Sequence, residues 1–258
     1  GIALQDMPNP DLDDLHTILY TSGTTGKPKG VMHSIGNFAE SVKIFSKELK
    51  LDNHPRLFSY LPLAHVAERM GIGTFGIYKG AEFTFAESLA TFASNLGECK
   101  PHLFFAVPRI WTKFQEKILE KLPQRKLNIL LKIPIISSVI KKKLKEKLGL
   151  GSAKYCISGA APLAASLIEW YKTIGITILE VYGMTEDCVL SHKNLPEDNK
   201  TGTVGKPWSG VQIKLSNDGE ICIKNKCMFK GYYKNPEVTA EFFDEDGYFK
   251  TGDCGEYD

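Results

Sequence analysis

Short apolar runs alternate with a helical pattern along the first part of the chain, and this alternation limits the folds available to it. The runs at 17–20, 57–61 and 83–85 are strand-like, and the stretch 37–50 between the first two has helical spacing. Strands separated by helices are typical of βαβ units and of a parallel sheet. The sequence therefore predicts an α/β fold with a largely parallel sheet flanked by helices.

The alternation of predicted strands and helices continues along the chain and then changes near residue 200. A strand, a helix and a strand are predicted at 153–158, 163–173 and 176–181. Beyond them, 211–215 and 220–224 alternate apolar and polar residues around an Asn-Asp-Gly turn, which indicates a hairpin. We expect two parts, an α/β part over 1–200 and a small β-rich, barrel-like subdomain over 201–258.

A basic segment interrupts the first part. Residues 113–147 hold eleven Lys or Arg and three Glu, a balance of +8 in a chain whose net charge is +2. The insertion 113–148 is predicted to form two amphipathic helices broken near Pro123 and Pro134. Its apolar block ends at Lys141, Lys142 and Lys143. Such a segment can lie on an anionic membrane or pack on the body as a solvated hairpin.

Composition excludes several classes of protein. A net charge of +2 is too small for a protein that binds nucleic acid by bulk charge. No apolar run is long enough for a transmembrane helix, and the first residues lack the pattern of a signal peptide. The six cysteines show no Cys-x-x-Cys spacing, so neither a zinc site nor a dithiol motif is indicated. We expect a cytoplasmic protein with reduced thiols.

The stretch 20–30 carries the clearest chemistry. It follows a strand-like run and is rich in hydroxyls, glycines and lysines, which bind anions through side-chain and backbone donors. It is not a Walker A loop, because Gly23 and Gly26 are too close and Pro28 follows the lysine. A polyphosphate loop is predicted. Its expected contacts are Thr21, Ser22, Gly23, Thr24, Thr25, Gly26, Lys27 and Lys29.

Together with five later motifs, this stretch resembles the signatures of the AMP-forming, adenylate-making ligases, which include acyl-CoA synthetases, luciferases and peptide-synthetase adenylation domains. The motifs follow the order of that family, and they lie at 61–66, 158–162, 182–186, 231–233 and 251–253. Residues 62–69, residues 107–111 and the basic insertion are most similar to long-chain fatty acyl-CoA synthetases. The resemblance implies ATP, Mg²⁺ and coenzyme A as ligands and a long-chain fatty acid as substrate.

Glu186 ends a Tyr-Gly-x-Thr-Glu turn after an apolar strand. One carboxylate in such a place can hold Mg²⁺ when phosphates and water complete the coordination. The resemblance assigns Glu186 to magnesium with Thr21 nearby, Thr185 to the α-phosphate, and Tyr182, beside Gly183, to stacking on adenine.

Five other positions are candidates for nucleotide or substrate contact. The small residues Gly159, Ala160 and Ala161 leave room for a flat base, and they also suit a strand-to-helix turn with Pro162 early in the helix. Asp253 in a Thr-Gly-Asp turn is an acceptor for ribose hydroxyls or a plain turn residue. His65 either contacts the substrate, orienting its carboxylate or lining an acyl tunnel, or is a core histidine.

Two other sequence patterns do not indicate a function. Residues 71–76 match the dinucleotide fingerprint G-x-G-x-x-G, but they follow a stretch with helical character, so close helix packing explains the glycines better. The hydrolase motif G-x-S-x-G is absent from the sequence.

We therefore expect the core of an AMP-forming fatty acid–CoA ligase, with Thr185, Glu186 and His65 acting in the reaction. Alternatives are a fatty acyl-AMP ligase that loads a carrier protein and a nucleotide- or acyl-adenylate-binding module without catalysis. Family members continue beyond the Thr-Gly-Asp motif and also begin earlier. The resemblance thus implies that this chain is an internal part of a longer enzyme, with limited turnover on its own.

Overall fold

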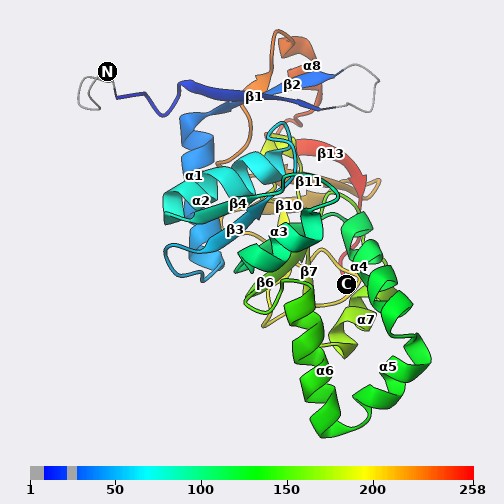
Figure 1. Ribbon diagram of the computed structural model, residues 1–258. Helices are drawn as coiled ribbons and strands as arrows, with labels where there is room; N and C mark the ends of the chain where they lie inside the picture. Colours follow the sequence, from blue (N-terminus) through cyan, green and yellow to red (C-terminus); the bar gives the residue numbers. More distant parts are fainter. Residues whose placement is uncertain (1–8, 22–27) are drawn as a thin grey trace, which may run out of the picture.

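A seven-stranded sheet forms the centre of the molecule (Figure 1). The computed structural model describes residues 9–21 and 28–258. The sheet has the order β4-β3-β5-β6-β7-β8-β9, in which the first five strands are parallel and the last two pair antiparallel. The predicted α/β fold with a largely parallel sheet is confirmed. The strands are β3 (Arg56–Ser59), β4 (Glu82–Phe85), β5 (Leu103–Ala106), β6 (Tyr155–Ser158), β7 (Ile178–Tyr182), β8 (His192–Lys193) and β9 (Lys206–Pro207).

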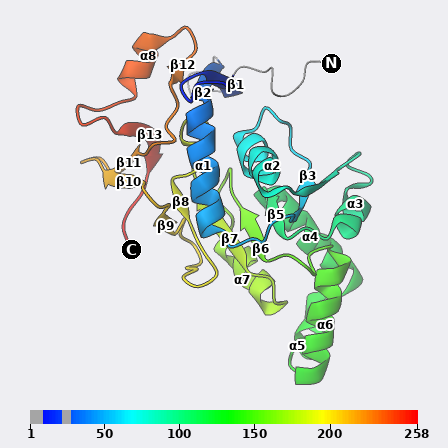
Figure 2. The ribbon, with the colours of Figure 1, turned by 90° about the vertical axis from the view of Figure 1, so that its left-hand side faces the viewer.

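Helices cover both faces of this sheet (Figure 2). Neighbouring residues on a strand point to opposite faces, so Leu103 joins one apolar core and Phe104 joins the other. Trp111, fully buried, anchors the second core. One face is covered by α1 (Ile35–Glu48), the π-helix η2 (Ala67–Thr74) and α2 (Phe75–Lys79), and the other by α3 (Phe92–Cys99), α4 (Pro108–Lys121) and α7 (Ala165–Thr173).

The first two strands belong to a separate sheet. β1 (Leu15–Thr21) and β2 (Lys29–Ser34) pair antiparallel, and β12 (Gly231–Tyr232) adds to β2. The expectation that the run at 17–20 joins the parallel sheet is therefore wrong. The register brings Thr21 opposite Lys29, so the two strands hold both ends of the predicted phosphate loop. Residues 22–27 of that loop lie outside the described residues.

The β-rich segment after residue 200 contains the predicted hairpin. β10 (Gln212–Leu215) and β11 (Glu220–Lys224) pair antiparallel, and β13 (Phe249–Cys254) adds to β11. The short helix α8 (Pro236–Glu241) follows β12. Because β12 pairs with β2, the C-terminal segment is tied to the strand that leaves the phosphate loop.

The basic insertion contains three helices where two were predicted. α4 ends at Lys121, α5 (Gln124–Leu131) follows Pro123, and α6 (Pro134–Lys147) begins with a proline. Proline lacks the amide hydrogen and cannot continue a helix, but it suits a first turn. Each proline therefore separates two helices, and α5 and α6 form a hairpin that projects from the body (Figure 1).

Two local predictions have different outcomes. The glycines of 71–76 lie on η2 and α2 and do not follow a strand, so they do not form a dinucleotide site. Close packing is confirmed at Gly76, where a Cβ would lie 2.3 Å from Phe83 Cζ, but not at Gly71, where a Cβ would meet nothing within 4 Å. Pro162 was expected early in a helix, but α7 begins only at Ala165, so Pro162 lies in the loop after β6.

Gly149, two residues after the end of α6, gives a test of this architecture. Its φ is +74°, and a Cβ there would lie 2.5 Å from the carbonyl oxygen of Leu96 in α3. We expect Gly149→Ala to lower the free energy of unfolding by about 2–4 kcal/mol, because backbone strain adds to overpacking. Gly210→Ala is the matched control, since its φ is +81° with nothing within 4 Å of the new Cβ. Urea unfolding of both variants measures the difference, and equal losses would show that Gly149 and Leu96 are not in close contact.

Candidate functional site

A cavity of about 580 Å³ lies at the carboxyl ends of β6 and β7, where open α/β sheets bind ligands. The loops that follow these two strands form part of its wall, with Ala160 after β6 and Thr185 after β7. Further walls come from β1, β2, η2, β12 and β13, so that segments distant in the sequence meet here.

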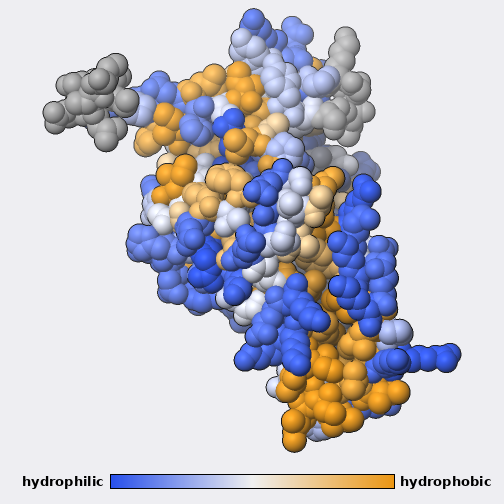
Figure 3. Space-filling model, viewed as in Figure 1, coloured by the Kyte–Doolittle hydropathy of each residue, from blue (hydrophilic) through white to orange (hydrophobic). Residues whose placement is uncertain are grey.

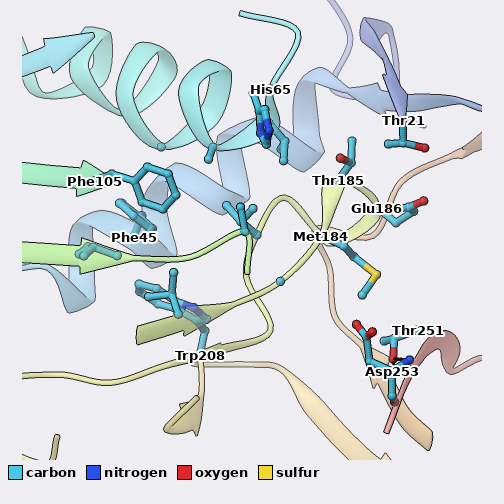
Figure 4. A pocket seen from close by; sticks show the side chains of 18 of the residues that line it. Thr21, Phe45, His65, Phe105, Met184, Thr185, Glu186, Trp208, Thr251 and Asp253 are labelled. Carbon is cyan, nitrogen blue, oxygen red and sulfur yellow. Dashed lines mark hydrogen bonds between the residues drawn. The ribbon is translucent and has the colours of Figure 1, made fainter. Parts of the chain in front are cut away.

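The cavity has an apolar and a polar side (Figure 4). Phe45, Phe105 and Trp208 lie on one side, and Trp208 stacks on Phe45 with the ring centroids 5.1 Å apart. His65 lies between the two sides. The polar side carries Thr21, Thr185, Glu186, Thr251 and Asp253. This division suits a ligand with one charged part and one apolar part.

The turn after β7 has an uncommon backbone. Thr185–Asp187 form one 3₁₀ turn, and the next two residues, Cys188 and Val189, have φ of +57° and +58°. Such values are disfavoured for residues with a side chain, above all for a β-branched one. Gly183 is required here, because a Cβ would lie 2.5 Å from the carbonyl carbon of Val189.

The buried carboxyl group of Asp187 holds the backbone of this turn through a hydrogen bond. Asp187 is fully buried, and its Oδ1 accepts a hydrogen bond of 2.8 Å from the amide of Met184. Loss of solvation, together with the charge of the neighbouring Glu186, raises the pKa of Asp187 to about 7. The polar contact inside the turn therefore fixes the direction in which Thr185 and Glu186 point.

His33 holds the same turn from β2. Its Nε2 lies 2.7 Å from the carbonyl oxygen of Thr185, and its Nδ1 lies 3.5 Å from Cys188 Sγ. Burial lowers the pKa of His33 to about 4, so the ring is neutral at pH 7. A neutral ring donates from Nε2 to the carbonyl and leaves Nδ1 as the acceptor for the thiol. This hydrogen bond therefore links β2, the strand that follows the predicted phosphate loop, to Thr185.

Glu186 is almost completely buried at the cavity wall. Its Oε1 accepts a hydrogen bond of 2.8 Å from the Tyr232 hydroxyl, and its backbone oxygen accepts one of 2.7 Å from the amide of Phe229. Burial and the adjacent carboxylate raise the pKa of the Tyr232 phenol, so the hydroxyl remains a donor. These contacts orient the carboxylate toward the cavity.

Lys29 supplies a cation at the same side. Its Nζ lies 4.1 Å from the ring centroid of Phe242 and 4.9 Å from that of Tyr232, distances at which a cation is attracted to an aromatic face. Within the described ranges, Lys29 makes no ion pair with an acidic side chain. The positive charge therefore faces the cavity without a carboxylate partner from that part of the chain.

Asp253 lies at the opposite end of the polar side. The Tyr182 hydroxyl donates to its Oδ2 at 2.7 Å. Its Oδ1 accepts no hydrogen bond from the described part of the chain, and it is the oxygen left for a ligand. Burial, followed by the contact with Asp253, raises the pKa of Tyr182, which keeps this donor protonated.

Most of the described residues that were predicted for the site meet in this cavity. Three predicted residues lie next to the cavity but do not line it. Gly159 and Ala161 flank Ala160, which has a φ of +67°, and Tyr182 donates a hydrogen bond to Asp253, which lines the cavity. Six predicted contacts, residues 22–27, lie outside the described residues. The predicted residues that line the cavity are Thr21, Lys29, His65, Ala160, Gly183, Thr185, Glu186 and Asp253.

Several residues of the site were not predicted. Tyr232 lies in the motif at 231–233, but nothing in the sequence indicates that its hydroxyl donates a hydrogen bond to Glu186. His33 follows the phosphate loop by a few residues, and its burial was the missing information. Phe45 and Trp208 have no local pattern that distinguishes them from other core aromatics, because only the tertiary structure brings them to the cavity.

Comparisons with known proteins agree with this geometry. Residues 3–233 match the family described as AMP-binding enzyme. The chain belongs to this family. It is 32% identical over 279 residues to a putative fatty-acid–CoA ligase, fadD11, of Mycobacterium tuberculosis, with 95% of this chain and 48% of that protein covered. It is 34% identical over 294 residues to long chain acyl-CoA synthetase 3 of Arabidopsis thaliana, with 98% and 44% covered.

Solved structures of the family share the fold. The N-terminal domain of FACL13 from Mycobacterium tuberculosis is 28% identical with a TM-score of 0.75, and the match covers 99% of this chain and 61% of that one. O-succinylbenzoate coenzyme A synthetase of Bacillus subtilis, in complex with AMP, is 25% identical with a TM-score of 0.75, covering 96% and 48%. The chain spans about half the length of the curated relatives it matches.

The buried His33 predicts a pH dependence of stability. Its folded pKa of about 4 lies below the ordinary value of 6.5, so the unfolded chain binds more protons between these values and stability falls as the pH falls through them. His192, whose pKa is also lowered to about 4 by burial, acts in the same direction. We expect His33→Gln, which keeps a donor for Thr185, to remove roughly half of this two-histidine contribution.

The measurement is urea unfolding of wild type and variant at pH 7 and pH 5. His192→Gln serves as the comparison. Asp187, whose folded pKa of about 7 lies above its ordinary value, acts in the opposite direction, because the folded state binds the extra proton there. The double variant should therefore no longer lose stability between pH 7 and pH 5. An unchanged pH dependence in His33→Gln would contradict a neutral, buried His33.

Proposed function

We propose that this chain is the nucleotide- and acyl-binding core of an AMP-forming long-chain fatty acid–CoA ligase. The observation that carries the proposal is a cavity in which a polar side suited to an anion and an apolar side meet at His65. Membership of the AMP-binding family and the names of its relatives support the same reaction class. ATP, a long-chain fatty acid and coenzyme A are the proposed substrates.

The proposed reaction has two steps. A carboxylate oxygen of the fatty acid attacks the α-phosphorus of ATP, and the bond to the bridging oxygen of the β-phosphate breaks, so that pyrophosphate leaves with the electron pair. The thiolate of coenzyme A then attacks the acyl carbonyl carbon, and AMP leaves. Both steps gain mainly from positioning and from neutralisation of charge.

The residues of the chain supply that positioning. Lys29 and the hydroxyl of Thr21 face the phosphates, together with the expected donors of residues 22–27. Thr185 contacts the α-phosphate, and Oδ1 of Asp253 accepts from the ribose. The small residue Ala160 leaves space for the base, while Tyr182 packs near it. His65, at the boundary of the two sides, orients the carboxylate toward the α-phosphate.

The donor set fits a magnesium ion. No group of three or more His, Cys, Asp or Glu side chains in the described ranges is placed to hold a metal. Mg²⁺ is commonly bound by one or two carboxylates, with phosphates and water completing its shell. Glu186, with one oxygen used by Tyr232, and the hydroxyl of Thr21 suit that role. When bound, the ion would neutralise charge on the pyrophosphate.

The proposed cellular setting follows from the substrate. Long-chain fatty acids partition into bilayers, so a cytoplasmic enzyme that contacts the inner face of a membrane through residues 113–148 has direct access to them. In the described part of the chain, no helix is long and apolar enough to cross a bilayer. The proposed contact is therefore peripheral.

The magnesium assignment predicts a selective loss in Glu186→Gln. We expect the affinity for ATP with Mg²⁺ to fall about tenfold, because the amide lacks the charge that holds the ion. The affinity for AMP without Mg²⁺ should change less than about twofold. Isothermal titration measures both constants.

Two control variants accompany it. Glu237→Gln removes an exposed carboxylate on α8 and should bind like wild type. Tyr232→Phe keeps the ring beneath Lys29 but removes the hydroxyl, and a loss smaller than that of Glu186→Gln is expected. Equal losses of AMP and magnesium-dependent ATP binding in Glu186→Gln would indicate a collapsed turn rather than a lost ligand.

The acyl site is tested with a hexadecanoyl sulfamoyl adenosine, a stable mimic of the acyl-adenylate. We expect wild type to bind it at least tenfold more tightly than AMP, because the apolar side adds buried area. A Cβ on Gly71, which lines the cavity, meets nothing within 4 Å, so Gly71→Leu can fill the space without a clash at the Cβ. This variant should lose the acyl preference and keep its AMP affinity.

The acetyl analogue is the control ligand, and its binding should change little in Gly71→Leu. No preference of wild type for the acyl compound would favour a nucleotide-binding module without an acyl site. An assay of a longer protein that contains this chain distinguishes the two ligase classes. After pyrophosphate is released from ATP and palmitate, transfer of the acyl group to coenzyme A indicates a CoA ligase, and transfer to a carrier protein indicates a fatty acyl-AMP ligase.

A further inference from the structure

The hairpin of α5 and α6 ends in a group of exposed aliphatic side chains, which we call the apolar tip (Figure 3). Aliphatic side chains are normally among the most buried, and a contiguous exposed group marks an interaction surface. The tip consists of Ile129 (62% exposed), Ile133 (44%), Ile135 (81%), Ile136 (38%) and Val139 (48%).

The apolar tip is not needed to hold the hairpin on the body. Leu127 is fully buried in the second core, and Ile140 and Leu144 pack against it. At the start of α6 the pattern is inverted, since Ser137 is buried while Ile135 and Ile136 are exposed. The larger apolar side chains therefore point away from the protein, where folding alone gives no reason for them.

Positive charge surrounds the tip. Residues 124–147 hold eight Lys or Arg and one Glu, a balance of +7. Lys126, Lys142 and Lys143 are exposed. Among the ion pairs of the described residues, none involves a side chain of this segment. The cations are thus free of carboxylate partners from the described part of the chain.

We propose that the apolar tip inserts end-on into an anionic lipid bilayer, with the surrounding lysines on the headgroups. Aliphatic side chains beside unpaired cations match the acyl region and the anionic surface of such a bilayer. A second copy of the chain fits less well, because it would bring two segments of +7 together. The inference deepens the proposed function by naming the contact surface, and its test needs neither ATP nor ligase activity.

The experiment is co-sedimentation of the whole chain with vesicles of phosphatidylcholine alone or with about one third phosphatidylglycerol, at low and high salt. We expect binding to the anionic vesicles only, weakened by salt. Ile135→Ser with Ile136→Ser, and separately Lys142→Glu with Lys143→Glu, should each lower the affinity at least tenfold.

Two matched controls keep the result specific. Lys47→Glu with Lys50→Glu makes the same charge change near the end of α1. Ile77→Ser with Leu89→Ser removes two exposed aliphatic side chains elsewhere, which are 76% and 92% exposed. Both control pairs should bind like wild type.

The proposal would be overturned if the tip variants bound vesicles as well as the control variants, or if wild type did not bind vesicles. So would a wild-type dimer, seen by light scattering, that Ile135→Ser with Ile136→Ser abolishes. Loss of acyl-adenylate binding with intact vesicle binding would refute the proposed function alone.

Discussion

The strained turn from Thr185 to Val189 holds the site together, and buried polar contacts maintain it. Positive φ at Cys188 and Val189 is costly, and it persists only where the surroundings determine the backbone. Asp187 bonds the amide of Met184 from inside the turn, and His33 donates to the carbonyl of Thr185 from β2. Both side chains are buried, so the loss of either contact would leave a buried polar group unsatisfied and would remove support for the strained backbone.

This turn connects parts of the chain that, in the proposed function, contact different regions of one ligand. Through His33 it is coupled to the strand leaving the phosphate loop, and through Glu186 to Tyr232 of β12. β13 contributes Asp253, which Tyr182 fixes from the end of β7. A nucleotide that contacts all of these groups would bridge the two smaller sheets across the end of the central one. The apolar side of the cavity begins next to His65.

The sequence predicted the central sheet and the site motifs because both depend on local patterns. Strand-helix alternation predicted β3, β4, β6 and β7, whereas β5 was not predicted. The resemblance of the ordered motifs to the adenylate-making ligases identified Thr185, Glu186 and Asp253. Pairing between strands is non-local, so the antiparallel sheet of β1, β2 and β12 was missed. The burial of His33 and the contact of Tyr232 with Glu186 were missed for the same reason. The third helix of the insertion follows from Pro123 and Pro134, because two helix-breaking prolines divide the insertion into three segments and not two.

The most direct measurement is a crystal structure of the chain with the hexadecanoyl sulfamoyl adenosine. The account predicts the sulfamoyl group beside Thr185, the ribose hydroxyls on Oδ1 of Asp253, and the acyl chain against Phe45 and Trp208. The turn at Cys188 and Val189 should keep its positive φ values. An acyl chain outside this cavity, or a ribose away from Asp253, would contradict the assignment of one ligand to both sides of the site.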